Sequence, residues 1–216
     1  MSLAHDWNQH YAAGDLPWDS GEPDPNLVEL VQSGRVAKGR ALEIGCGTGT
    51  NALWLGEQGF EVVALDLAPL AIEKARAKAA AAPKAAAERC SFAASDFLAD
   101  ELPKGTFQLV FDRGCFHVFE EAKEQSSFAE RVGKLLAPGG LWLSLIGSTE
   151  GPAREFGPPR RSAREILNAL EPHVELLSLR AMEFEGLPDR GPAPKSWHCL
   201  TRKREVPAQP SSRYTG

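Results

Sequence analysis

The sequence predicts an α/β fold built around a βαβ unit, and three observations in one stretch support this. A short apolar run leads directly into a glycine-rich turn at 45–49. An amphipathic segment, 51–58, follows and ends at Gly59, where a helix can close with a left-handed residue. A second apolar run then stops at Asp66. Strand, glycine turn, helix, strand and acid is the order of a nucleotide-binding unit.

The spacing of the glycine turn distinguishes between nucleotide ligands. A dinucleotide site uses G-x-G-x-x-G to seat a pyrophosphate at the helix N-terminus. This turn reads G-x-G-x-G, and Glu43 lies two residues before its first glycine. A carboxylate there opposes a phosphate but attracts a cation, and Asp66 can accept bonds from two ribose hydroxyls. S-adenosylmethionine, with a ribose, a sulfonium and no phosphate, fits better than a dinucleotide. A glycine turn in another α/β protein is the alternative.

The motif E-x-G-x-G-x-G, with Asp66 after the next strand, resembles the first two motifs of the class I methyltransferases. The resemblance implies a doubly wound, Rossmann-like domain with a mostly parallel seven-stranded sheet and S-adenosyl-L-methionine as cofactor. It also implies that Asp96, after the third strand, bonds the adenine amino group with Phe97 nearby; a helix or turn cap is the alternative role for Asp96. The residues expected to bind the cofactor are Trp18, Glu43, Gly45, Cys46, Gly47, Gly49, Asp66, Leu67, Asp96, Phe97 and Asp112.

Length and composition favour one domain over 1–216 with a small-molecule substrate. The chain is 43% hydrophobic and 25% charged, which is ordinary for a globular protein. A net charge of −5 gives no electrostatic footprint for nucleic acid. No apolar run is long enough for a bilayer, and no secretion signal is visible, so we expect neither a membrane partner nor export. The four cysteines are scattered, which favours reduced thiols in the cytoplasm and neither disulfides nor a metal site.

An extension, 3–39, precedes the core domain, which we place at 40–203; a polar tail, 206–216, follows it. Trp7 and Tyr11 are four residues apart, which suits a short helix, and the Pro-rich stretch 17–25 must be irregular. The aromatic residues could form a hydrophobic plug or a lid over the cofactor. W-x-x-x-Y followed by P-W-D-x-G-x-P resembles the start of the thiol, thiopurine and tellurite-type methyltransferases. This resemblance implies a lid that includes Trp18.

The segment after the fourth predicted strand, 107–111, is expected to face the transferred methyl group. Ligands of open α/β sheets bind beyond the carboxyl ends of the strands. Asp112-Arg113-Gly114 is similar to the thiopurine methyltransferases, and this implies that Arg113 approaches the substrate. His117 is the second catalytic candidate, although a lone histidine is more often structural. Cys115 is more often a small hydrophobe.

The remaining elements follow from periodicity and caps. Helices are predicted at 26–33, 70–82 and 121–137, and a third strand at 89–94. Pro138-Gly139-Gly140 should end the last of these helices before a fifth strand at 141–146. Ser162 and Glu165 form a capping box for a further helix. The stretches 174–184 and 195–202 should be an antiparallel pair of strands. Arginines in the loop 147–161 (Arg154, Arg160 and Arg161) could steer an anion or simply be solvated.

The function predicted from these features is S-adenosylmethionine-dependent methylation of a small molecule. Resemblance to the thiol and thiopurine branch favours a soft nucleophile such as a thiol, halide or tellurite, which needs no protein base. An oxygen or nitrogen acceptor would need a base, for which His117 is the candidate. A non-catalytic regulatory protein that binds the cofactor is the alternative of another class. We expect a monomer or weak homodimer.

Overall fold

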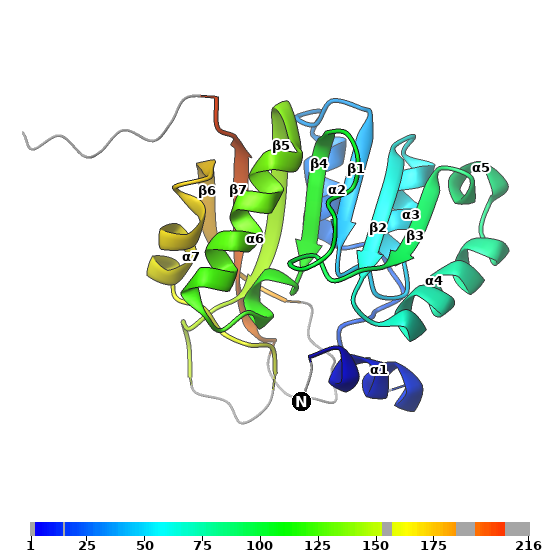
Figure 1. Cartoon of the computed structure of the whole chain (residues 1–216), viewed down its shortest axis with the longest axis horizontal. Helices are drawn as coiled ribbons and strands as arrows, with labels where there is room; N and C mark the ends of the chain where they lie inside the picture. Colours follow the sequence, from blue (N-terminus) through cyan, green and yellow to red (C-terminus); the bar gives the residue numbers. More distant parts are fainter. Residues whose placement is uncertain (1–2, 15, 153–156, 185–192, 206–216) are drawn as a thin grey trace, which may run out of the picture.

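The computed structural model describes residues 3–14, 16–152, 157–184 and 193–205. Its centre is a seven-stranded sheet in the order β3-β2-β1-β4-β5-β7-β6. Strands β1 to β5 are parallel to one another, and β7 is antiparallel to both β5 and β6. Figure 1 shows the strands running side by side, with α1 lying beyond the carboxyl ends of β2 and β4. The predicted doubly wound, mostly parallel sheet is confirmed.

The N-terminal half forms as its pattern predicts. Two helices, α1 (Leu3–Ala13) and α2 (Pro25–Gln32), precede β1 (Arg40–Ile44). The βαβ unit continues through α3 (Thr50–Glu57) and β2 (Glu61–Asp66). Gly59 has φ +90°, the left-handed conformation expected after the helix. The helix α4 (Pro69–Ala81) leads to a short α5 (Lys84–Ala87) and to β3 (Cys90–Ala94). The sequence pattern does not reveal α5, a single turn that starts directly after Pro83.

The C-terminal half begins with β4 (Phe107–Arg113), the 3₁₀ helix η1 (Phe116–Val118) and α6 (Ala122–Leu135). The strand β5 (Leu136–Gly147) follows α6 directly. The capping box of Ser162 and Glu165 is present at α7 (Ala163–Leu170), which leads to β6 (Val174–Glu183) and β7 (Lys195–Lys203). The antiparallel pairing of the last two strands is confirmed.

One boundary was predicted wrongly. Pro138, Gly139 and Gly140 lie inside β5 and do not separate it from α6. The β4–β5 pairing shifts its register between Phe107 and Leu109. This irregularity lets β5 include Pro138, Gly139 and Gly140. A Cβ on Gly140 would lie 2.7 Å from the carbonyl oxygen of Phe107, so only glycine fits there. The predicted tail, 206–216, lies outside the described residues.

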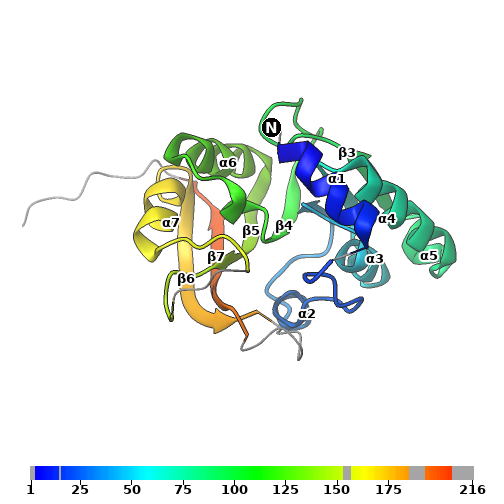
Figure 2. The same ribbon diagram turned by 90° about the horizontal axis from the view of Figure 1, so that it is seen from below.

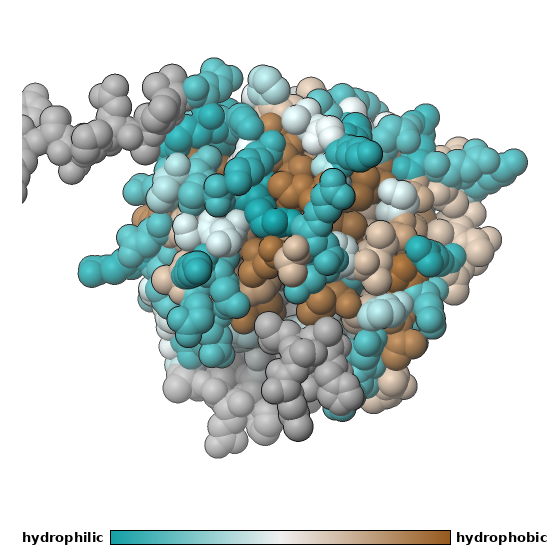
Figure 3. Space-filling model, viewed as in Figure 1, coloured by the Kyte–Doolittle hydropathy of each residue, from teal (hydrophilic) through white to brown (hydrophobic). Residues whose placement is uncertain are grey.

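Helices cover both faces of the sheet and create two apolar layers. Side chains of α2, α3 and α4 pack with one face of the strands. Those of α6 and α7 pack on the other, around Phe128 and Trp142. Figure 2 shows α6 and α7 on one side of the sheet and α2 and α3 on the other. The face in Figure 3 is a mixture of hydrophilic areas and smaller hydrophobic ones. No helix in the described part of the chain is long and apolar enough to cross a membrane.

Candidate functional site

The glycine turn and Asp66 meet at the carboxyl ends of β1 and β2. Asp66 Oδ2 accepts a hydrogen bond of 2.8 Å from the backbone N–H of Gly47, and Oδ1 accepts one of 2.9 Å from that of Ala68. Burial raises the pKa of Asp66, and these two donors oppose that rise. Each carboxylate oxygen can accept a second hydrogen bond. The side chain is therefore held in place with acceptor capacity left for hydroxyl groups of a ligand.

Glu43 is the other acid of this turn, and half of its carboxyl group has no partner. It is 2% exposed; Oε1 accepts a bond of 3.1 Å from Asn51 Nδ2, and Oε2 has no hydrogen-bond partner among the described residues. Burial raises its pKa to about 8. An ionised carboxylate in such a place is stabilised by a nearby cation. The arrangement suits a positively charged ligand next to the turn, as the sequence indicates.

The N-terminal segment lies over the glycine turn. A Cβ on Gly47 would be only 3.1 Å from the Tyr11 hydroxyl, which shows how closely α1 approaches the turn. The Trp18 ring packs edge-on against Trp7, with 5.5 Å between ring centroids. Thr48 Oγ1 donates a bond of 2.6 Å to Asp19 Oδ2. The segment is thus bonded to the turn itself.

Arg113, at the end of β4, ties down the same segment. Its Nε donates a bond of 2.8 Å to Asp24 Oδ2, and its Nη1 one of 2.8 Å to the carbonyl oxygen of Trp18. The Asp24 side chain is 4% exposed and that of Arg113 17%, so the ion pair is largely shielded from water. The guanidinium carbon lies 5.3 Å from the centre of the Phe184 ring. Its charge is therefore already paired, whereas the sequence analysis expected Arg113 to hold the acceptor.

Two further residues expected at the cofactor, Asp96 and Phe97, have their side chains engaged within the fold. Asp96 Oδ1 accepts bonds from the N–H groups of Leu98 (2.8 Å) and Ala99 (3.2 Å), which is the turn-capping alternative. The Phe97 ring lies in the core, 4.8 Å from that of Phe128.

Asp112 is fully buried, and its oxygens accept from the Phe116 N–H and from Trp142 Nε1. Burial raises its pKa to about 6. Its carboxylate organises the turn after β4 and is closed to a ligand, contrary to the sequence-based expectation. Cys46 is buried, and Leu67 is half-buried directly after Asp66.

His117 lies in η1, and one backbone hydrogen bond determines which ring nitrogen carries the proton. The N–H of Gly147 donates to His117 Nδ1 over 2.8 Å, so the proton of the neutral ring is on Nε2. Burial and the positive charges of Arg161 and Arg113 lower the pKa of His117 to about 3. A ring whose only lone pair is occupied by a backbone donor is poorly placed to act as a base. This geometry opposes the predicted alternative of base catalysis.

Comparison with known proteins identifies the family. The family model for thiopurine S-methyltransferase matches residues 3–185. The chain belongs to the thiopurine S-methyltransferase family. The predicted resemblance to class I methyltransferases of the thiopurine and thiol type is therefore confirmed. A probable thiol methyltransferase 2 of Arabidopsis thaliana is 37% identical over 153 residues, which cover 71% of this chain and 65% of that protein. The match thus spans less than two thirds of that relative.

Other relatives and structures agree with the family. Thiocyanate methyltransferase 1 of Brassica oleracea is 32% identical over 73% of this chain and 67% of its own length. A structure determined in work on the conversion of a disulfide bond into a thioacetal group during echinomycin biosynthesis is 25% identical. It has a TM-score of 0.78 and covers 94% of this chain and 92% of its own. The N-methyltransferase NodS of Bradyrhizobium japonicum (TM-score 0.72, 19% identity, covering 94% and 100%) shares the fold.

The two described arginines of the loop after β5 donate to different backbone carbonyl oxygens. Arg160 donates to backbone carbonyl oxygens of its own loop, among them those of Ser148 (2.8 Å) and Thr149 (2.5 Å). Its role is thus to shape the loop. Arg161 donates to the carbonyl oxygens of Arg160 and Phe119. The third of these arginines, Arg154, lies outside the described residues.

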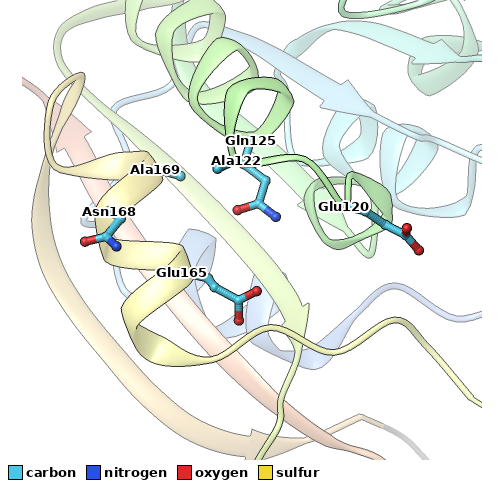
Figure 4. Close-up of a pocket in the computed structure, with 6 residues that line it drawn as sticks. All are labelled: Glu120, Ala122, Gln125, Glu165, Asn168 and Ala169. Carbon is cyan, nitrogen blue, oxygen red and sulfur yellow. The ribbon is translucent and has the colours of Figure 1, made fainter.

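A separate cavity of about 140 Å³ lies between α6 and α7, away from the glycine turn. Figure 4 shows the residues that line it: Glu120, Ala122, Gln125, Glu165, Asn168 and Ala169. None of them is among the predicted site residues, and the wall holds no cation, so we assign the chemistry to the turn and not to this cavity. In the described part of the chain no cluster of histidine, cysteine and acidic residues could hold a metal ion.

Proposed function

We propose that this protein is an S-adenosylmethionine-dependent methyltransferase that acts on a small molecule with a soft, anionic nucleophile. The observation that supports S-adenosylmethionine as the cofactor is the pair of acids at the glycine turn. Glu43 presents a buried, unpartnered oxygen to a cationic ligand, and Asp66 has acceptor capacity for the ribose hydroxyls. Membership of the thiopurine S-methyltransferase family supports the same cofactor and reaction.

The reaction proposed is a direct displacement at the methyl carbon. The nucleophile's lone pair forms the new bond to the methyl group while the carbon–sulfur bond of the sulfonium breaks. That bonding pair remains on sulfur, and the product is the neutral thioether S-adenosylhomocysteine. Because an anion and a cation neutralise each other, water stabilises the reactants more than the transition state. Alignment of the reactants in a site that excludes water accelerates the step.

A soft acceptor that arrives ionised agrees with the state of His117. The only lone pair of its neutral ring accepts from the Gly147 N–H, so the residue has no capacity to take a proton from a phenol or an amine. A thiolate, thiocyanate or halide needs no such base. The names of the relatives, a probable thiol methyltransferase and a thiocyanate methyltransferase, support this class of acceptor.

The segment 7–25 is proposed to act as a lid over the bound cofactor. Arg113 holds Trp18 and Asp24, and Thr48 of the glycine turn holds Asp19, so the segment is attached to both sides of the site. Such a cover excludes water from the reacting atoms. We further propose that the protein acts in the cytoplasm, as a monomer or weak homodimer, without nucleic acid or membrane partners.

The test is a turnover screen that measures S-adenosylhomocysteine formation with thiocyanate, iodide, bisulfide, an aromatic thiol, a phenol and a primary amine. We expect turnover with the first four. Turnover restricted to the phenol or the amine would show that the protein is an O- or N-methyltransferase. Cofactor binding by calorimetry without turnover of any acceptor would support the non-catalytic, regulatory alternative.

A further inference from the structure

His117 combines a fixed tautomer with a ring nitrogen that is still available. The Gly147 N–H occupies Nδ1, which leaves the proton on Nε2. Nε2 has no hydrogen-bond partner among the described residues, and the residue is 4% exposed. A Cβ on Gly114 would lie 3.1 Å from Nε2, so this glycine keeps the space beside the nitrogen open. The ring therefore keeps one N–H donor that no described residue uses.

The positive charges on either side of this ring differ in what they bind. Arg113 is paired with the buried carboxylate of Asp24. Arg161 donates only to carbonyl oxygens, those of Arg160 (3.1 Å) and Phe119 (2.8 Å). Its Nε is buried without a hydrogen-bond partner among the described residues, and its guanidinium forms no ion pair with a described carboxylate. Arg161 thus carries a charge that has no ion-pair partner among the described carboxylates.

Arg161 also lies along the same wall as His117. Its backbone N–H donates to the carbonyl oxygen of Gly147, the residue that fixes the imidazole, and its Nη2 reaches Phe119, two residues after His117. The bonds that the Glu165 carboxylate accepts from the N–H and hydroxyl of Ser162, and to a smaller extent the Arg161 charge, lower the pKa of Glu165 at the start of α7. The Phe184 ring packs near both His117 and Arg113: its centroid lies 6.3 Å from that of the imidazole and 5.3 Å from the Arg113 guanidinium carbon.

We propose that His117 Nε2–H and the guanidinium of Arg161 form the subsite that binds the methyl acceptor as a small anion. The subsite rests on the proposed function and names its substrate class: an anionic nucleophile such as thiocyanate or a thiolate, held by two donors and by a guanidinium that forms no ion pair with a described carboxylate. His117 is a hydrogen-bond donor here and not a base. Arg161 replaces Arg113 as the cation that selects the acceptor.

Thiocyanate binding provides the test, because thiocyanate is anionic at every pH used and gives a signal without turnover. The full chain is first saturated with S-adenosylhomocysteine, and potassium thiocyanate is then titrated at constant ionic strength in a calorimeter. Arg161→Gln and His117→Asn are compared with the wild type. Asparagine keeps an oxygen that can accept from the Gly147 N–H but lacks the Nε2–H donor. Arg164→Gln, an exposed arginine on α7, is the control with the same change of charge.

We expect each site variant to weaken thiocyanate binding at least tenfold, the size of one hydrogen bond to a charged group, and Arg164→Gln to change it less than twofold. Affinity for S-adenosylhomocysteine should be unchanged in all of them. Equal thiocyanate binding by Arg161→Gln and the wild type would overturn the subsite while leaving the proposed function intact. A wild type that does not bind S-adenosylhomocysteine would overturn the proposed function itself.

A second readout keeps the proposal testable if a variant folds poorly. In ¹⁵N-detected spectra of the wild type, His117 should remain neutral with its proton on Nε2 from pH 5 to 8, and thiocyanate should shift the Nε2 signal. A proton on Nδ1, or a Nε2 signal that thiocyanate leaves in place, would contradict the role of His117 as donor.

Discussion

The cofactor side and the acceptor side of the site differ in how their charged groups are used. At the glycine turn, Glu43 has an unpartnered oxygen and Asp66 has spare acceptor capacity, so two carboxyl groups are left for a ligand to satisfy. At the acceptor side, Arg113 and Asp112 are both bonded within the fold, and Arg161 forms no ion pair with a described carboxylate. The two sides therefore predict opposite ligands, a cation at the turn and an anion near η1.

The largest expected effect is at Asp66. Asp66→Ala removes the acceptor for two ribose hydroxyls, each worth about 1.5–3 kcal/mol. We expect S-adenosylhomocysteine to bind at least tenfold more weakly, and roughly a hundredfold if both bonds are lost. Calorimetry measures the affinity, and a thermal melt checks folding, because Asp66 also accepts from two backbone N–H groups. Unchanged affinity in a folded variant would show that Asp66 does not bind the ribose.

The next effect is the pH dependence of stability caused by Glu43. Its folded pKa of about 8 lies above the value of 4.5 for an exposed group. Between those values the folded state holds a proton that the unfolded state has released, so the free energy of unfolding falls as pH rises. The total fall is at most about 5 kcal/mol. In Glu43→Gln this contribution is absent.

Urea unfolding at pH 5 and pH 8.5 measures the Glu43 effect. The wild type should lose more stability over this interval than Glu43→Gln, while exposed Glu57→Gln should behave like the wild type. An identical pH slope in all three proteins would show that Glu43 is ionised in the free protein. A ligand cation should reverse the trend, because it favours the ionised carboxylate; binding of S-adenosylmethionine would then release a proton.

A smaller effect is expected for the ion pair that holds the N-terminal segment. Removing one partner of a buried ion pair costs about 3–5 kcal/mol, and the 17% exposure of Arg113 reduces this to roughly 2 kcal/mol. Arg113→Gln and Asp24→Asn should each speed proteolysis within the segment 7–25. The double variant should be no faster than Arg113→Gln alone, because Arg113→Gln already removes the ion pair as well as the bond to the Trp18 carbonyl oxygen. If the single variants were cleaved at the wild-type rate, the segment would be held by its aromatic packing alone.

The smallest effect should come from the cap of α7. The capping residue, Ser162, directly follows Arg161. Ser162→Ala removes the capping side chain and should cost about 1 kcal/mol of stability. Because the cap belongs to the acceptor side, KM for the acceptor should rise while the cofactor's affinity stays constant. A change in cofactor affinity instead would contradict the separation of the two sides.

The sequence could reveal the cofactor side because its parts are contiguous. The turn, α3 and Asp66 lie within about one βαβ unit, where apolar runs and glycines predict the geometry directly. The seven strands were likewise predictable, apart from the start of β5. There Pro138 and the two glycines look like a loop, but pairing with β4 and a close approach to Phe107 draw them into the strand.

The acceptor side could not be predicted in the same way, because it is assembled from distant segments. The partner of Arg113 is 89 residues away at Asp24, and the backbone group that fixes His117 is 30 residues away at Gly147. Residue types alone suggest that Arg113 holds the acceptor, and only the pairing shows that its charge is used. For Arg161 the sequence shows an arginine in a loop; the absence of a described carboxylate partner depends on the fold.

The central claim is methyl transfer to a nucleophile that needs no protein base, and the pH dependence of kcat/KM tests it most directly. Two acceptors are compared in the wild type: thiocyanate, which does not titrate, and an alkyl thiol with a pKa near 8.5. At saturating S-adenosylmethionine, we expect a flat profile for thiocyanate from pH 6 to 9, and a tenfold rise per pH unit for the thiol below its pKa. A shared limb near pH 6.5 for both acceptors, lost in His117→Asn, would identify His117 as a base and contradict the account.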